Sequence, residues 1–174
     1  EFNNLIKKIF TKKFYYFLSI FFASIYTSFF ILMIWIFIIP LNEKSTISII
    51  FLLLLCASTD IGGYVFGNIF GGKKITKISP KKTYSGLIGS FVFSIIVGIV
   101  FNNFFDQIIV LDVNLYALII TISLVSQIGD LFLSFIKRKA HVKDTGSILP
   151  GHGGILDRID GILFALPLGI LLIN

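Results

Sequence analysis

The sequence predicts an all-α, polytopic transmembrane helical bundle with about five spans. Three observations lead to this fold class. Hydrophobic residues make up 56% of the chain and charged residues only 14%, whereas soluble domains average roughly 25% charged residues. The apolar residues form long runs without the alternation that is typical of a strand. Because a chain in lipid must satisfy its backbone groups internally, such runs predict helices.

Five apolar segments have the length that a spanning helix needs, which is roughly 17 to 25 residues. They comprise residues 14–39, 47–70, 86–105, 113–136 and 155–173. The first segment follows several lysines, as the apolar core of a signal peptide does, but it is far longer than the roughly 7 to 15 residues of such a core. We therefore interpret it as a retained span.

The basic residues predict the orientation. If the chain starts in the cytoplasm, alternating crossings place the loops around residues 71–85 and 137–154 inside and those around 40–46 and 106–112 outside. Of the 15 Lys and Arg residues, Lys44 alone then lies outside, as the positive-inside rule requires. We expect an integral membrane protein of a bacterial-type inner membrane. Basic loops between spans favour lipid headgroups and phosphates as ligands rather than nucleic acid.

Small residues indicate helix contacts in and beside the second and third spans. Their four-residue spacing lets helix backbones approach closely, and they are Gly63, Gly67, Gly71, Gly86, Ser90, Ser94 and Gly98. We expect these positions to serve packing rather than chemistry. Cys56 is the one cysteine, which excludes a disulfide framework and a cysteine metal site.

Two carboxylates interrupt the apolar runs. Asp60 and Asp130 lie toward the cytoplasmic ends of their spans, and an ionised carboxylate within a span costs roughly 2.5 to 3.5 kcal/mol. Asp157 and Asp160 begin the last span from the same side, so all four can converge at one depth. The structural alternative is a buried ion pair, such as Asp157 with Lys137. Asp130 also belongs to a polar stripe on one helical face, made of Ser123, Ser126, Gln127, Asp130 and Ser134.

The two cytoplasmic loops carry groups that bind phosphate. The loop of residues 137–154 combines cations with glycines, whose backbone N–H groups can form an anion nest. A helix beginning near Ile155 would direct its N-terminal dipole to the same anion. Carboxylates alone would repel a polyphosphate, so their presence predicts a divalent metal between them, Mg²⁺ with oxygen ligands. The other loop adds Lys73, Lys74, Lys77, Lys81 and Lys82.

Four motifs follow one another in the last third of the chain. They are Ser134-Phe135-Ile136-Lys137-Arg138, Lys143-Asp144-x-Gly146, Leu149-Pro150-Gly151-His152-Gly153-Gly154 and Asp157-Arg158-x-Asp160. Together with residues 60–64 and 79–83, they resemble the signature of the phosphatidate cytidylyltransferase family over residues 58–161. The chain departs from that signature at Asn68, where family members often have a basic residue, and at Tyr84-Ser85, where they often have Trp-Glu.

The resemblance implies transfer of CMP from CTP to phosphatidic acid, giving CDP-diacylglycerol and pyrophosphate in phospholipid biosynthesis. It assigns metal binding to Asp130, Asp157 and Asp160, with Mg²⁺ as the cofactor and a second cation left open. The catalytic phosphate contacts are assigned to Lys137, Arg138, Lys143, His152 and Arg158. Substrate binding is assigned to Asp60, Ser79, Lys81, Lys82, Gly151, Gly153 and Gly154. His141 is expected to face solvent.

The same resemblance suggests a division of the chain. Residues 1–45 form an N-terminal basic segment with the first span, and residues 46–174 form the catalytic transmembrane domain, with the metal and CTP site at its cytoplasmic face. We expect CTP, phosphatidic acid and membrane lipid as partners, and we leave a homodimer open. Family members usually carry further spans upstream and this chain starts at Glu1, so we expect a C-terminal fragment.

Two alternatives remain at this point. The first is a CTP-dependent lipid kinase, such as a polyprenol kinase, which would use a similar basic site but transfer the γ-phosphate. The second is a non-enzymatic membrane transporter, for which carboxylates within spans are also typical. A transporter does not require the glycine-rich nest, and product analysis separates the kinase from the cytidylyltransferase.

Overall fold

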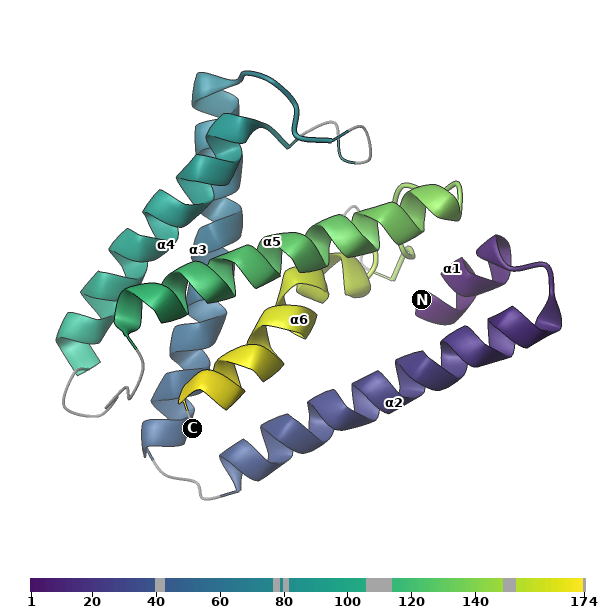
Figure 1. Ribbon diagram of the computed structural model, residues 1–174, viewed down its shortest axis with the longest axis horizontal. Helices are drawn as coiled ribbons and strands as arrows, with labels where there is room; N and C mark the ends of the chain where they lie inside the picture. The colour runs from purple at the N-terminus through teal and green to yellow at the C-terminus, as the bar shows by residue number, and fades with distance from the viewer. Residues whose placement is uncertain (40–42, 77–78, 80–81, 106–113, 149–152, 174) are drawn as a thin grey trace.

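The computed structural model describes residues 1–39, 43–76, 79, 82–105, 114–148 and 153–173. Within these residues the regular structure is helical, and an isolated antiparallel bridge pairs Lys74 with Thr83. The predicted all-α class is therefore confirmed. The helices (Figure 1) are α1 Phe2–Ile9, α2 Lys13–Ile38, α3 Glu43–Phe70, α4 Tyr84–Phe105, α5 Leu115–Lys139 and α6 Leu156–Ile173.

Four of the described helices, α2 to α5, are long and apolar enough to cross a membrane. They agree with the first four predicted spans and differ from them by a few residues at their ends. The fifth predicted span corresponds to α6, which has 18 residues and carries Asp157, Arg158 and Asp160 near its start. The expectation of about five spans is consistent with this arrangement.

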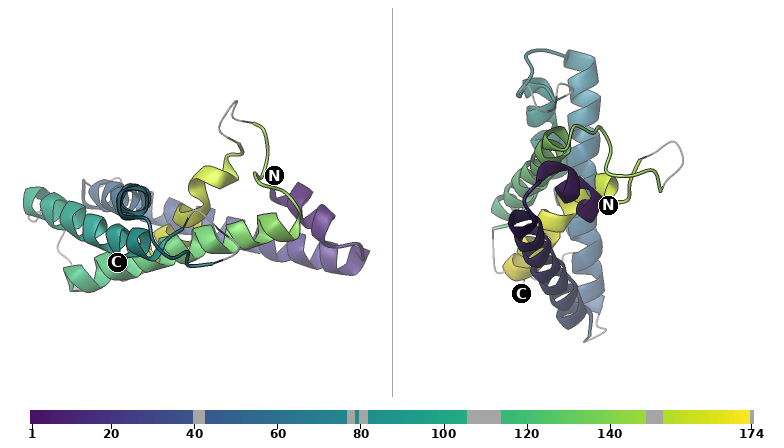
Figure 2. Two further views of the ribbon diagram at one scale, coloured as in Figure 1. Left: turned by 90° about the horizontal axis from the view of Figure 1, so that it is seen from above. Right: turned by 90° about the vertical axis from the view of Figure 1, so that its right-hand side faces the viewer.

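Two antiparallel helix hairpins form the centre of the fold. α3 packs along α4, and α5 packs along α6 (Figure 1). The hairpins cross where α3 contacts both α5 and α6, and α2 runs beside α6 on the side away from α4 (Figures 1 and 2). The main hydrophobic core lies at this crossing, and its buried residues include Phe51, Leu52, Leu55, Leu118, Ile119, Ile122, Ala165, Leu166 and Ile170.

Small residues bring α3 and α4 into close contact, as their spacing predicted. Gly71 is an exception, because it follows α3 and a Cβ atom added there would meet nothing within 4 Å. A Cβ atom added at Gly86 would lie 2.7 Å from the carbonyl oxygen of Gly63. Ser90 Oγ donates to the Thr59 carbonyl oxygen across the same contact, at 2.8 Å. Gly62, which the four-residue spacing did not select, lies equally close, because a Cβ there would be 2.6 Å from the carbonyl oxygen of the facing glycine, residue 89.

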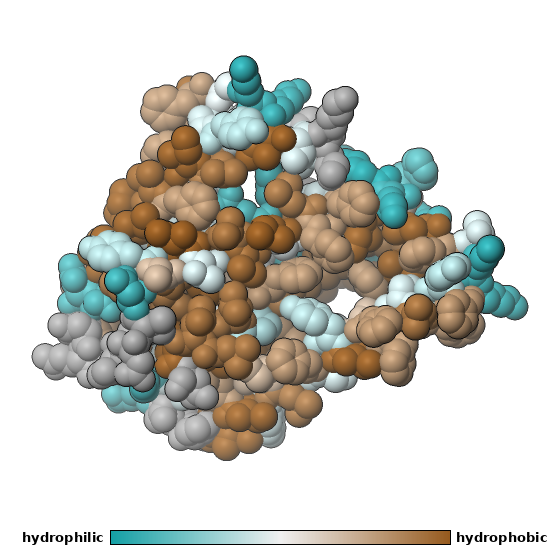
Figure 3. All heavy atoms as spheres, viewed as in Figure 1, coloured by the Kyte–Doolittle hydropathy of each residue, from teal (hydrophilic) through white to brown (hydrophobic). Residues whose placement is uncertain are grey.

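The helix ends gather on two sides of the molecule. The C-terminal ends of α3 and α5 and the N-terminal ends of α4 and α6 lie toward the top and right of Figure 1, and their opposite ends lie toward the lower left. Hydrophobic residues cover most of the face between these ends, with hydrophilic residues near its edges (Figure 3). Such a pattern is expected of helices that cross an apolar layer several times.

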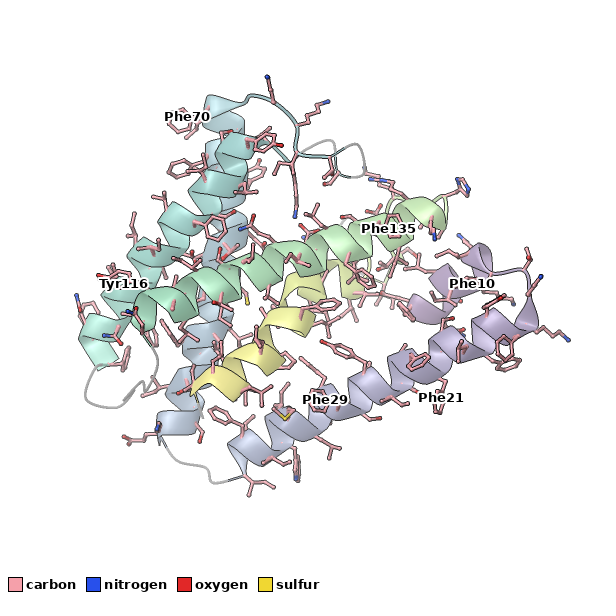
Figure 4. The ribbon with its side chains drawn as sticks, viewed as in Figure 1. Phe10, Phe21, Phe29, Phe70, Tyr116 and Phe135 are labelled. Carbon is pink, nitrogen blue, oxygen red and sulfur yellow. The ribbon has the colours of Figure 1, made fainter. Side chains whose placement is uncertain are left out.

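Many aromatic side chains point outward from the helices (Figure 4). Phe21 on α2, Phe70 at the end of α3 and Tyr116 at the start of α5 are all more than half exposed. In a bundle that crosses a membrane, such positions face lipid or the membrane boundary. The abundant phenylalanines are therefore explained by the surroundings of the helices rather than by a ligand.

Candidate functional site

A cavity of about 440 Å³ lies between the two hairpins. It is found where α3 and α5 end and where α4 and α6 begin. Its charged lining residues are Asp60, Lys82, Asp130, Lys137, Asp144, Asp157, Arg158 and Asp160. Its uncharged polar lining includes Thr59, Ser79, Thr83, Ser90 and Gln127. The most polar part of the bundle therefore lies at one end of its apolar helices.

Four carboxylates reach this cavity from three helices. Asp60 comes from α3, Asp130 from α5, and Asp157 and Asp160 from the start of α6. Asp130 interacts electrostatically with both Asp60 and Asp160. Because neighbouring ionised carboxylates repel one another, cations or shared protons among them stabilise this arrangement.

One of these cations is Lys82. Its Nζ lies 2.5 Å from Asp130 Oδ2, and both side chains are 26% exposed. The lysine is held in place by its own loop, because its carbonyl oxygen accepts from Ile75 N at 3.0 Å. The next residue, Thr83, caps α4 by accepting from Gly86 N at 3.1 Å. The ion pair therefore connects the start of α4 to α5.

The second cation is Lys137, which forms the ion pair that was considered as the structural alternative. Its Nζ lies 2.7 Å from Asp157 Oδ1, and the two side chains are only 12% and 10% exposed. The pair joins the end of α5 to the first turn of α6. Asp157 is thus held by a cation of the protein itself.

The other oxygen of Asp157 binds the loop that precedes α6. Oδ2 accepts from Thr145 N at 2.8 Å, from Thr145 Oγ1 at 3.0 Å and from Gly154 N at 2.9 Å. Thr145 is buried, with 6% of its surface exposed. A carboxylate near a helix N-terminus is also favoured by the helix dipole. Asp157 therefore fixes the loop and the first turn of α6 relative to each other.

The N-terminal amides of α6 hold a carboxylate rather than an open anion site. Glu1 accepts from Ile155 N at 2.9 Å through Oε1 and from Leu156 N at 2.7 Å through Oε2. Burial raises the pKa of Glu1, but the hydrogen bonds from Leu156, Ile155 and Thr145 outweigh it and hold the pKa below its ordinary value. The helix begins where the sequence predicted, but its dipole stabilises a side chain of the same chain.

The predicted site residues divide into three groups. Those that line the cavity are Asp60, Ser79, Lys82, Asp130, Lys137, Asp157, Arg158 and Asp160. Arg138, Lys143, Gly153 and Gly154 do not line it; Arg138 is exposed and donates from Nη1 to the Val142 carbonyl oxygen at 3.2 Å. Lys81, Gly151 and His152 lie outside the described residues. His141 is exposed, as expected.

The cavity also contains residues that the sequence did not assign to it. Gln127 belongs to the polar stripe three residues before Asp130, and Asp144 belongs to one of the motifs, so both had a signal. Thr59 precedes Asp60 directly. Thr145 does not line the cavity but binds Asp157, and it had no signal, because this contact depends on the path of the intervening loop.

The donor chemistry around Asp130 and Asp160 suits a hard divalent cation such as Mg²⁺, which prefers oxygen ligands. The two carboxylates are neighbours, and Asp60 interacts electrostatically with Asp130. Both oxygens of Asp157 are engaged by Lys137 and Thr145. Asp130 is engaged as well, through its ion pair with Lys82 and a hydrogen bond from Ser134 Oγ. Across the described part of the chain, no group of three or more His, Cys, Asp or Glu side chains is close enough together to hold a metal. Asp130 and Asp160 are thus a pair of carboxylates of the kind that holds Mg²⁺ together with substrate phosphates.

Comparison with known proteins gives a consistent result. The sequence pattern described as "Cytidylyltransferase family" matches residues 2–174. Proteins named phosphatidate cytidylyltransferase are 46% identical to this chain over 131 residues in Staphylococcus epidermidis, 48% over 128 residues in Staphylococcus saprophyticus and 44% over 131 residues in Staphylococcus aureus. Each alignment covers 72% of this chain and 49% of the relative. The chain thus spans about half the length of the curated relatives it matches.

Proposed function

Because the chain belongs to the cytidylyltransferase family, we propose that it forms part of a phosphatidate cytidylyltransferase, which transfers CMP from CTP to phosphatidic acid. The observation that carries this proposal is the charged cavity between the two hairpins. It lies where apolar helices end, so a water-soluble nucleotide and the phosphate of a membrane lipid can meet there. The names of the staphylococcal relatives support the same assignment.

In the proposed reaction, a phosphate oxygen of phosphatidic acid attacks the α-phosphorus of CTP. A new P–O bond forms, the bond from the α-phosphorus to the oxygen bridging to the β-phosphate breaks, and pyrophosphate leaves with that electron pair. The attacking oxygen is already an anion, so catalysis depends mainly on positioning and on charge neutralisation. Lys82, Lys137 and Arg158 are the lining cations available to the phosphates.

We assign Asp130 and Asp160 to Mg²⁺, which neutralises phosphate charge when it is bound. Asp157 has a positioning role. It orients Lys137 through their ion pair and holds the preceding loop through Thr145. Lys82 separates the like charges of Asp60 and Asp130. The basic loops support a cytoplasmic position for this cavity in an inner membrane.

The experiment that tests the function uses the full-length parent protein with CTP labelled at the α-phosphate, phosphatidic acid and Mg²⁺. Label should appear in the lipid as CDP-diacylglycerol, with release of pyrophosphate. CTP labelled at the γ-phosphate should leave the lipid unlabelled, because a lipid kinase would transfer that group instead. The variant Asp130→Asn serves as the control and should give no product. Lipid labelled from the γ-position, or no labelled lipid from either substrate, would contradict the proposal.

A further inference from the structure

We propose that Tyr26 is a positioning residue for the site. Its hydroxyl binds the backbone carbonyl that Pro167 leaves without a helical donor, and this contact fixes the first half of α6, which lines the cavity. The inference rests on the proposed function in one respect, since it takes the start of α6 as part of the reaction site. The hydrogen bond itself is independent of any activity.

Pro167 interrupts the hydrogen-bond ladder of α6. Proline has no backbone N–H, so it cannot donate to the carbonyl of Leu163 four residues earlier. Leu163 lies about 10 Å along the helix from Leu156, at roughly 1.5 Å per residue. Its side chain packs against the second hydrophobic cluster, which contains Leu133 and Ile136 of α5. An unpaired carbonyl in such apolar surroundings is costly.

Tyr26 of α2 supplies the missing donor. Its Oη donates to the Leu163 carbonyl oxygen at 2.5 Å. Its ring stacks on that of Phe164, with 5.7 Å between centroids and 30° between planes. Other hydroxyls of α2, those of Ser19 and Thr27, instead bind carbonyls of α2 itself. The Tyr26 contact therefore connects two helices rather than satisfying a donor locally.

The side of α2 that carries Tyr26 also packs against the main core. Its partly buried residues follow helical spacing of three and four, and they are Phe30, Met33, Ile34 and Phe37. The opposite face of α2 is exposed along its length, for example at Phe21 and Trp35. α2 is thus held along one stripe, and Tyr26 is the polar contact at the end of that stripe nearest the start of α6.

The first half of α6 is pressed against α5 as well. A Cβ atom added at Gly129 of α5 would lie 2.8 Å from the Asp160 carbonyl oxygen, and one at Gly161 would collide with Ser126 Oγ. α6 lies between α5 and α2 (Figure 1), so the hydroxyl of Tyr26 holds it from the other side. Pro167 interrupts the hydrogen bonding of α6 after Asp157 and Asp160. If the direction of α6 changed at this point, the part of the helix that carries these two cavity carboxylates would move.

The test is a double-mutant cycle in the full-length protein. Tyr26→Phe keeps the ring but removes the hydroxyl, and Pro167→Ala returns an N–H donor to the Leu163 carbonyl. Tyr26→Phe should lower the melting temperature in detergent, raise amide hydrogen exchange in residues 156–162, and reduce kcat by about threefold to tenfold, the size expected for one lost hydrogen bond. In the Pro167→Ala background these effects should largely disappear.

A matched control is available on the same helix. Tyr16 donates to Asn3 Oδ1 at 2.7 Å in an exposed position, so Tyr16→Phe should leave exchange in α6 and kcat unchanged. Equal effects of Tyr26→Phe in both backgrounds would show that its hydroxyl does not compensate for Pro167. If Tyr26→Phe lowers the melting temperature but leaves amide hydrogen exchange in α6 and kcat unchanged, Tyr26 only holds α2 in place. Either result overturns the inference.

Melting and hydrogen exchange need no turnover. They therefore decide the inference even if the wild-type protein makes no CDP-diacylglycerol, a result that would count against the proposed function alone.

Discussion

At the residue scale, the two ion pairs of the cavity differ in how deeply they lie. Asp157 and Lys137 are 10% and 12% exposed, whereas Asp130 and Lys82 are each 26% exposed. A buried pair that loses one partner leaves an uncompensated charge, which destabilises a protein by roughly 3 to 5 kcal/mol. A more exposed pair is screened by water and contributes about 1 kcal/mol or less.

This difference predicts separate outcomes for two isosteric substitutions. Asp157→Asn should lower the stability of the full-length protein by several kcal/mol, about 3 or more, because Lys137 and the donors of Thr145 lose their acceptor charge. Asp130→Asn should abolish turnover with a loss of only about 1 kcal/mol. Thermal unfolding in detergent without Mg²⁺, alongside product assays, measures both. Equal losses of stability would contradict the predicted difference.

Thr145 allows a sharper test at the same scale, because its hydroxyl and its N–H both bind Asp157 Oδ2. Thr145→Val keeps the shape but removes the hydroxyl, so it should cost about 1 kcal/mol of stability and lower kcat. Thr145→Ser keeps the hydroxyl and should restore most of both. The free energy of unfolding and kcat are measured for the wild type and for both variants. If serine and valine variants behave alike, the hydroxyl does not hold Asp157.

The sequence predicted the carboxylates of the cavity better than their partners. Asp60 and Asp130 are conspicuous because charge within an apolar run is costly, and helical spacing shows which residues share their face. The pairing of Lys82 with Asp130 depends on how a loop folds back over another helix. Periodicity contains no information about such a contact. The contact between Glu1 and the start of α6 was not predicted, for the same reason.

At the scale of elements, the contact between α3 and α4 depends on residues without side chains. A Cβ atom at Gly62 would lie 2.6 Å from the carbonyl oxygen of Gly89, and helix backbones cannot give way as a flexible side chain can. Gly62→Ala should therefore destabilise the hairpin by about 1 to 3 kcal/mol, as overpacking generally does.

The matched control for this substitution is Val92→Ala on α4. Val92 is 40% exposed, so its truncation should have little effect on stability. Detergent unfolding of both variants, with wild type as reference, gives the comparison. A Gly62→Ala protein as stable as Val92→Ala would mean that the two backbones can separate without cost.

Hydropathy predicted the long helices because each presents an apolar surface, to lipid or to neighbouring helices, along its whole length. It gave no indication of α1, which has eight residues and only two buried ones, Leu5 and Ile6. Leu5 packs on Leu133 and Ala140 at the end of α5. A helix this short is stabilised by the surface it contacts, and that surface belongs to a distant part of the chain.

At the scale of the whole molecule, the orientation in the membrane can be tested with single cysteines. Lys73 follows α3 and Lys44 lies in its first turn, and both are exposed. Lys73→Cys should react with an impermeant thiol reagent only from the cytoplasmic side, and Lys44→Cys only from the other side. Native Cys56 is 1% exposed and should stay silent. Labelling of Lys73→Cys from outside intact cells would contradict the proposed orientation.

The ion pair between Lys82 and Asp130 can form only late in biosynthesis. Lys82 lies just before α4, whereas Asp130 lies on α5, so the ribosome completes the first hairpin before the partner of this lysine exists. Segments of a chain generally fold as they are made, N-terminal parts first. The α3–α4 hairpin, with Asp60 and Lys82 at its end, is therefore expected to form before α5 and α6 are present. A chain whose translation stops before α5 therefore lacks Asp130, Lys137, Asp157 and Asp160 of the cavity.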